Sequence, residues 1–129
     1  MISAFYIAIL SLIYLGLTFY VIRFRRSQLI SLGDGEYKPL RKAIRAHANF
    51  IEYTPLFIIM FYICETQGLL SGYLHIFGLG FVIGRILHPI GIMKPRTLMI
   101  LRQNGMILTL LSYIGLISTL LIKNIPVIF

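Results

Sequence analysis

Three polar residues in the segment 41–55 have the types and spacing needed for chemistry, because they lie inside otherwise apolar sequence. Arg45, Asn49 and Glu52 are separated by four and then three residues, which places them on one face of a helix. Glu52 is one of only four acidic residues in the chain. A carboxylate is costly in lipid, so we expect this face to lie against other helices, where Glu52 meets a cationic or hydrogen-bonding partner.

Two later segments supply further polar residues for such a site. Arg85 and His88 lie three residues apart near the end of one apolar segment, and Arg102 lies near the start of the next. A structural ion pair between Glu52 and Arg85 is the simpler interpretation, but it leaves the excess of cations unexplained. That excess favours an anionic ligand, because arginine binds carboxylates in a bidentate manner. A ligand with two carboxylates and one ammonium fits this charge pattern, with the ammonium at Glu52.

The composition indicates which elements must position these residues. The chain has 129 residues, of which 58% are apolar, and its mean hydropathy is +0.88. The apolar residues form long runs, which is typical of helices that cross a membrane. We therefore predict an all-α integral membrane protein with a single domain over residues 1–129. The net charge of +8 does not indicate nucleic-acid binding here, because the basic residues cluster at the ends of the apolar runs.

Four membrane-spanning helices are predicted, running up, down, up and down. They are expected at about residues 1–26, 40–66, 69–90 and 96–122. The first apolar run is followed, not preceded, by basic residues, so we interpret it as a retained helix and not as a cleaved signal peptide. Pro55 is expected to kink the second helix, and Pro89 with Gly91 to disturb or end the third. Gly84 is one of three glycines expected to let the third helix approach its neighbours closely.

The distribution of basic residues predicts the orientation. Seven of the twelve basic residues lie between positions 23 and 45, and four lie between 85 and 102. Both zones belong on the cytoplasmic side by the positive-inside rule, with both termini outside. The chain holds no metal-ligand spacing, and Cys64, its only cysteine, is expected to be a buried packing residue.

These segments resemble a known family, the membrane-associated proteins in eicosanoid and glutathione metabolism (MAPEG). The segment 45–55 resembles the family's hallmark, and the segment 84–88 resembles its third-helix motif. Arg102 with Gly105 resembles the fourth-helix motif, and the loop 32–35 is like the first loop of bacterial members. The resemblance covers nearly the whole chain. The family includes microsomal glutathione transferases and the 5-lipoxygenase-activating protein.

The resemblance implies a homotrimer of four-helix protomers in a bacterial inner membrane, with glutathione bound between protomers on the cytoplasmic side. It implies a glutathione transferase, with possible glutathione peroxidase activity, that acts on hydrophobic electrophiles or lipid hydroperoxides. Arg102 matches the arginine that stabilises the glutathione thiolate, and Arg96 is the alternative. The residues that match glutathione-binding positions are Arg23, Arg45, Asn49, Glu52, Arg85 and His88. Ala48 and Ile92 depart from the pattern of eicosanoid-forming members, which disfavours those activities.

Two alternatives come from other classes of protein. The first is a non-catalytic lipid-binding or scaffold member of the same family, against which the presence of Arg45, Asn49, Glu52 and Arg102 argues. The second is a small transporter in which Glu52 and His88 relay protons. The short loops and the lack of an inverted repeat argue against a transporter.

Overall fold

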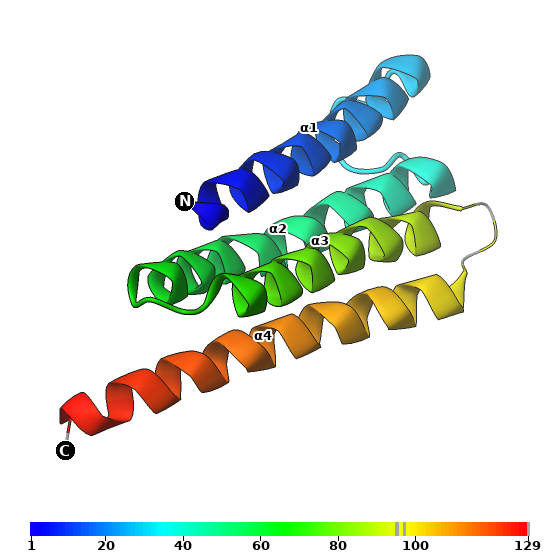
Figure 1. Cartoon of the computed structure of the whole chain (residues 1–129). Helices are drawn as coiled ribbons and strands as arrows, with labels where there is room; N and C mark the ends of the chain where they lie inside the picture. The colour runs from blue at the N-terminus through cyan, green and yellow to red at the C-terminus, as the bar shows by residue number, and fades with distance from the viewer. Residues whose placement is uncertain (95, 97, 129) are drawn as a thin grey trace.

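The structure, a computed structural model, describes residues 1–94, 96 and 98–128 (Figure 1). That part of the chain forms four helices and no strand. The helices are α1 (Ile2–Gln28), α2 (Lys38–Thr66), α3 (Ser71–Met93) and α4 (Met99–Ile128). The predicted all-helical class is confirmed.

The four helices alternate in direction, so the N-terminus and the C-terminal end of α4 lie at the same end of the bundle (Figure 1). Hydrogen bonds between helix ends agree with this arrangement. The Tyr6 hydroxyl of α1 lies 3.0 Å from Nδ1 of His75 near the start of α3. The Lys123 ammonium of α4 donates to the carbonyl of Gln67, directly after α2, at 2.6 Å. The opposite end therefore holds the end of α1, the start of α2, the end of α3 and the start of α4.

The connection between α1 and α2 adopts a left-handed backbone at several residues. Leu29 follows the last residue of α1 with φ 54°, and its amide donates to the carbonyl of Arg26 at 3.4 Å. Gly33 (φ 68°) and Gly35 (φ 54°) then turn the chain. Pro39 lies in the first turn of α2, where its missing amide leaves no hydrogen bond unmade.

Two predictions about helix ends were wrong. Pro89 does not end α3, which continues to Met93, because the Lys94 amide donates to the Ile90 carbonyl at 3.3 Å and the last turn packs against α4. Helix α2 continues through Pro55, and the kink expected there stays a prediction. Helix α4 begins at Met99 and continues to Ile128, beyond the expected end at 122. The predicted 96–122 helix includes Thr97, which lies outside the described residues.

Three of the four helices are long and apolar enough to cross a membrane: α1, α3 and α4 as far as Ile125. Helix α2 has sufficient length but not the composition, because its first half carries Arg41, Lys42, Arg45 and Glu52. Three of the four predicted membrane-spanning helices therefore have the composition of a span. Large apolar side chains are exposed along the outside of the bundle, as expected for a surface that contacts lipid tails.

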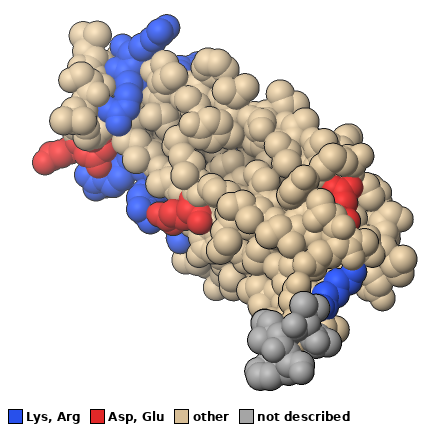
Figure 2. Space-filling view, turned by 90° about the vertical axis from the view of Figure 1, so that its left-hand side faces the viewer, with Lys and Arg blue, Asp and Glu red and all other residues tan. Residues whose placement is uncertain are grey.

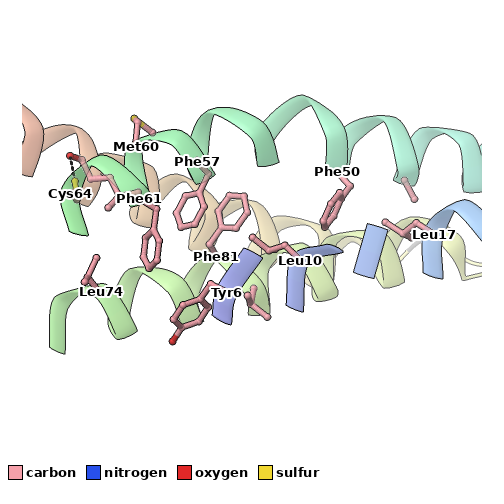
Figure 3. Packing of buried hydrophobic residues seen from close by; sticks show 13 residues of the cluster. Tyr6, Leu10, Leu17, Phe50, Phe57, Met60, Phe61, Cys64, Leu74 and Phe81 are labelled. Atoms are coloured by element: carbon pink, nitrogen blue, oxygen red, sulfur yellow. Dashed lines mark hydrogen bonds between the residues drawn. The ribbon is translucent and has the colours of Figure 1, made fainter. Parts of the chain in front are cut away.

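Aromatic rings fill the core toward the end that carries the termini (Figure 3). Phe57 of α2 and Phe81 of α3 stack with ring centroids 3.7 Å apart and planes 6° from parallel. Tyr6 and Phe61 pack edge to face beside them, with centroids 5.5 Å apart. Cys64 is buried in the same cluster as an unpaired thiol, as expected. This ring cluster ties α1, α2 and α3 together.

Glycines allow α3 and α4 to approach at the other end of the bundle, as the sequence predicts. A Cβ atom on Gly84 would lie 2.7 Å from the carbonyl oxygen of Gly105, and one on Gly105 would lie 2.7 Å from the His88 amide nitrogen. A Cβ on Gly91 would lie 2.8 Å from the Arg102 amide nitrogen. Backbone therefore packs directly on backbone here, which brings His88 of α3 and Arg102 of α4 together.

Candidate functional site

A cavity of about 290 Å³ lies where the start of α2, the end of α3 and the start of α4 meet. Its volume is at the small end of the roughly 300–1,000 Å³ of ligand sites. The residues that line it are Arg41, Lys42, Arg45, Asn49, His88, Ile92 and Arg102. Four of these seven are cations and none is acidic. The cavity opens at the end of the molecule where the basic residues gather (Figure 2).

Helix periodicity explains how α2 presents its polar side chains to this cavity. Lys42, Arg45 and Asn49 follow at three- and four-residue spacing, so they lie along one side of the helix. The buried residues Ala43, Ala46 and Phe50 lie next to them and pack the adjoining side into the bundle. The predicted placement of Arg45 and Asn49 on one face is thus seen in the structure, and both residues reach the cavity.

Arg85 lies beneath the cavity and does not line it. Its side chain is completely buried, and its guanidinium donates to the Asn49 side-chain oxygen at 3.0 Å. Two further nitrogens, Nε and Nη2, donate to the Thr109 hydroxyl at 3.1 and 2.6 Å. The rings of Tyr53 and Phe81 lie 5.0 and 5.7 Å from the guanidinium carbon. A buried cation is therefore held by neutral acceptors and aromatic faces, without a carboxylate among the described residues.

His88 and Arg102 form the wall of the cavity opposite α2. Nδ1 of His88 lies 3.1 Å from the backbone carbonyl of Arg102. A carbonyl only accepts, so this bond assigns a proton to Nδ1 and leaves Nε2 as the acceptor of a neutral imidazole. Nε of Arg102 is buried and has no hydrogen-bond partner among the described residues. A buried guanidinium nitrogen that lacks an acceptor is costly, which suits a site completed by a ligand.

Glu52 and Arg23 are not brought to this cavity. Both side chains are exposed, and neither has a hydrogen bond or ion pair with a described residue. The alternative of a structural ion pair between Glu52 and Arg85 is not found within the protomer, whereas a partner for Glu52 from another copy of the chain stays a prediction. Asn49 is the residue that contacts Arg85. Glu52, three residues further along α2, lies at a different angle around the helix axis and faces the outer surface.

Sequence reasoning missed three residues around the site. Arg41 and Lys42 line the cavity, and neither was among the predicted site residues. The position of Lys42, three residues before Arg45, was the available signal. Thr109 shares a helix face with Arg102 in the sequence, but nothing in the sequence indicated that it would hold Arg85.

The arrangement offers hydrogen-bond donors almost exclusively. Guanidinium and ammonium groups donate and do not accept, so the cavity suits a ligand that carries carboxylates. Among the described residues, no three His, Cys, Asp or Glu side chains lie close enough together to hold a metal ion. The site therefore has the chemistry of an organic-anion site in which an arginine is available to stabilise a developing negative charge.

Fold and cavity together define a class: a helical membrane bundle with a cationic cavity at one end. The chain belongs to the MAPEG family, whose model matches residues 3–122, so the resemblance noted in the sequence is confirmed. It is similar to the inner membrane protein YecN of Escherichia coli K12, with 34% identity over 91 residues that cover 70% of each chain. The protein of the same name from Escherichia coli O6:H1 matches equally well. No solved structure matches the chain.

Proposed function

We propose that this membrane protein is a glutathione-dependent transferase or peroxidase that binds glutathione in the cationic cavity. The observation that carries the proposal is Arg102, which lines the cavity and whose buried Nε has no acceptor among the described residues. A peptide with two carboxylates fits a wall of guanidinium and ammonium groups, and membership of the MAPEG family supports the choice of glutathione.

The residues around the cavity divide into binding and activating groups. Arg45 and Asn49 donate hydrogen bonds to carboxylate or amide oxygens of the bound peptide, and His88 offers an acceptor. Arg102 lowers the pKa of the glutathione thiol, which is otherwise near 8.5, so that more thiolate is present at neutral pH. The thiolate then forms a sulfur–carbon bond with an apolar electrophile and displaces its leaving group, or it reduces a lipid hydroperoxide.

Assembly as a homotrimer is part of the proposal. Glu52 is exposed on the surface of one protomer in the middle of α2, where a carboxylate that faces lipid is costly. A second copy that covers this surface relieves the cost and adds partners for Glu52. Arg23, also exposed and without a partner among the described residues, is the cation that a neighbouring protomer contributes to the shared site. The cavity then faces the cytoplasm in an inner membrane, with both termini outside.

One feature favours the non-catalytic, lipid-binding alternative. A second cavity, of about 300 Å³, lies between α1 and α2 and has an apolar lining. Its lining residues include Leu10, Tyr14, Phe50, Ile51 and Pro55. A lipid chain fits this lining, and such binding needs none of the cations around the other cavity.

The proposal is tested first by isothermal titration of the detergent-purified protein with glutathione, and then by a transferase assay with a hydrophobic halo-nitroarene. Native mass spectrometry of the same preparation is expected to give three copies per particle. Absence of binding at millimolar glutathione contradicts the proposed enzymatic function and leaves the lipid-binding alternative. Binding without turnover of any electrophile or hydroperoxide favours that alternative as well.

Arg102→Ala is expected to lower turnover by roughly 100-fold, the effect of removing one group that stabilises a developing anion. It also raises the pKa of the bound thiol, which a titration of thiolate ultraviolet absorbance measures. Arg96→Ala is the matched control, because Arg96 is exposed and does not line the cavity. An unchanged thiol pKa in Arg102→Ala, or a larger loss in Arg96→Ala, contradicts the role of Arg102.

A further inference from the structure

The buried Arg85 joins three helices through one chain of hydrogen bonds. The Thr109 hydroxyl donates to the Gly105 carbonyl at 2.8 Å and accepts from two guanidinium nitrogens of Arg85. The remaining terminal nitrogen of Arg85, Nη1, donates to the side-chain oxygen of Asn49 at 3.0 Å and approaches its backbone carbonyl at 3.4 Å. Thr109 itself is completely buried and does not line the cavity.

This chain decides which end of the Asn49 amide faces the cavity. A guanidinium has only donors, so Asn49 must turn its oxygen toward Arg85. The N–H₂ group then lies at the other end of the same planar amide. Because Asn49 lines the cavity, its two N–H donors are available in the space that Arg102 also lines. A flipped amide would place an oxygen toward the ligand and repel a carboxylate.

We propose that Thr109 is a positioning residue for a carboxylate ligand: it holds the Arg85 guanidinium, which holds the Asn49 amide with its N–H₂ group toward the cavity. Without the Thr109 hydroxyl, two buried N–H groups of Arg85 lack an acceptor and must turn to other oxygens. Asn49 then loses the contact that selects its orientation. The choice of glutathione as the natural ligand rests on the proposed function, whereas the preference for a carboxylate rests on this hydrogen-bond chain.

Isothermal titration with two probes, glutathione and the simple dicarboxylate glutarate, tests the proposal. Thr109→Val is expected to raise the Kd for both probes by roughly tenfold, in line with the loss of a hydrogen bond to a charged group. Thr109→Ser keeps the hydroxyl and is expected to bind within about twofold of wild type. Thr119→Val is the matched control, because Thr119 of α4 makes the same bond to the carbonyl four residues before it, at 2.8 Å, away from the cavity.

A double mutant separates positioning from general destabilisation. In an Asn49→Ala background the amide is absent, so Thr109→Val is expected to change the Kd by no more than about twofold. Asn49→Asp gives a second test that does not require a change at Thr109. It keeps an oxygen for Arg85 but replaces the N–H₂ donors by a carboxylate oxygen, so binding of both probes is lost while the melting temperature is retained.

The outcomes are distinguishable. Wild-type affinity in Thr109→Val or Asn49→Asp overturns the inference, and so does an equal loss in Thr119→Val or an additive loss in the Asn49→Ala background. If wild type binds glutarate but not glutathione, the proposed function fails, and the Thr109 comparison on glutarate still decides the inference. If wild type binds neither probe, both are overturned.

Discussion

The two halves of the bundle are held together by different interactions. In the half around the cationic cavity, which we call the cavity half, Arg85 bonds to Asn49 and Thr109 while glycine backbones touch between α3 and α4. In the half nearer the termini, the aromatic half, stacked and edge-on rings such as Phe57 and Phe81 fill the core (Figure 3). Directional polar bonds to Arg85 dominate the core of the first half, and ring packing dominates the core of the second.

The difference separates stability from binding capacity. Packed rings have no hydrogen-bond donor or acceptor to satisfy, so the ring cluster of the aromatic half contributes stability without offering polar groups to a ligand. In the cavity half buried donors need acceptors, and Nε of Arg102 has none among the described residues. We therefore expect substitutions in the aromatic half to change stability more than affinity, and substitutions in the cavity half to change both.

Phe57→Ala is expected to have the largest effect on stability. The Phe57 ring is 1% exposed and contacts Phe61, Phe81 and Tyr113. Its removal is expected to lower the free energy of unfolding by about 3 kcal/mol, which is the low end of the range for a buried phenylalanine. The low end applies because the hydrophobic effect drives helix association less in lipid than in water. Reversible unfolding in mixed detergent micelles measures the change. Affinity for glutathione is expected to remain within about twofold of wild type at a temperature where the variant is folded.

Ile59→Ala is the control for this experiment. Ile59 lies on the same helix, but its side chain is 55% exposed on the outside of the bundle. The free energy of unfolding is therefore expected to change by less than about 0.5 kcal/mol. If Phe57→Ala abolishes glutathione binding while leaving stability intact, the proposed separation between the two halves is wrong.

Gly84→Ala is expected to have an intermediate effect, and to lower both the stability and the affinity for glutathione. The added Cβ would lie 2.7 Å from the Gly105 carbonyl oxygen and 2.7 Å from the Thr109 hydroxyl, so α3 and α4 must move apart. Overpacking of this kind lowers the free energy of unfolding by about 1–3 kcal/mol. Movement of α4 also carries Arg102 away from Asn49, so glutathione binding weakens.

Gly16→Ala provides the contrast to Gly84→Ala. Nothing lies within 4 Å of a Cβ built on Gly16 of α1, and alanine favours a helix over glycine. This variant is therefore expected to be as stable as wild type or slightly more stable. Reversible unfolding measures the stability of both variants, and titration measures their affinity for glutathione. A Gly84→Ala protein with wild-type stability and affinity shows that the close helix approach is not needed in the cavity half.

The helical class and part of the cavity lining could be predicted because both depend on local sequence pattern. Long apolar runs indicate helices, and three- and four-residue spacing places Arg45 and Asn49 on one face. Helix ends were less predictable. Pro89 removes an amide donor, but buried packing against α4 continues the helix to Met93, and that packing depends on a different segment of the chain.

Long-range partners were the part of the site that could not be predicted. The sequence indicates that Arg85 needs acceptors, but Thr109, an acceptor on another helix, is 24 residues away. Glu52 was assigned to the same cluster because helical periodicity does not distinguish a face turned inward from one turned partly outward. A residue that another copy of the chain covers has the same pattern as one that is buried within its own protomer.

The smallest effect is expected at the edge of the cavity half, in the loop that leads to α2. The partly exposed Asp34 carboxylate forms an ion pair with Arg41, which lines the cavity. The hydrogen bond from Arg41 lowers the pKa of Asp34 below its ordinary value. A lowered pKa means that the stabilisation is present above the pKa of the unfolded chain and is lost as the pH falls through the folded value. Exposed pairs contribute little, so Asp34→Asn is expected to change the glutathione Kd less than about twofold.

The pH dependence makes this last prediction specific. Melting temperatures of wild type and Asp34→Asn are compared from neutral to acid pH. The small difference in favour of wild type at neutral pH is expected to vanish in acid, since the protonated carboxyl no longer pairs with Arg41. A difference that grows in acid has the wrong sign for this ion pair. A large loss of glutathione affinity in Asp34→Asn shows instead that Arg41 must be held by Asp34 for the cavity to bind, which extends the cavity half to include the loop before α2.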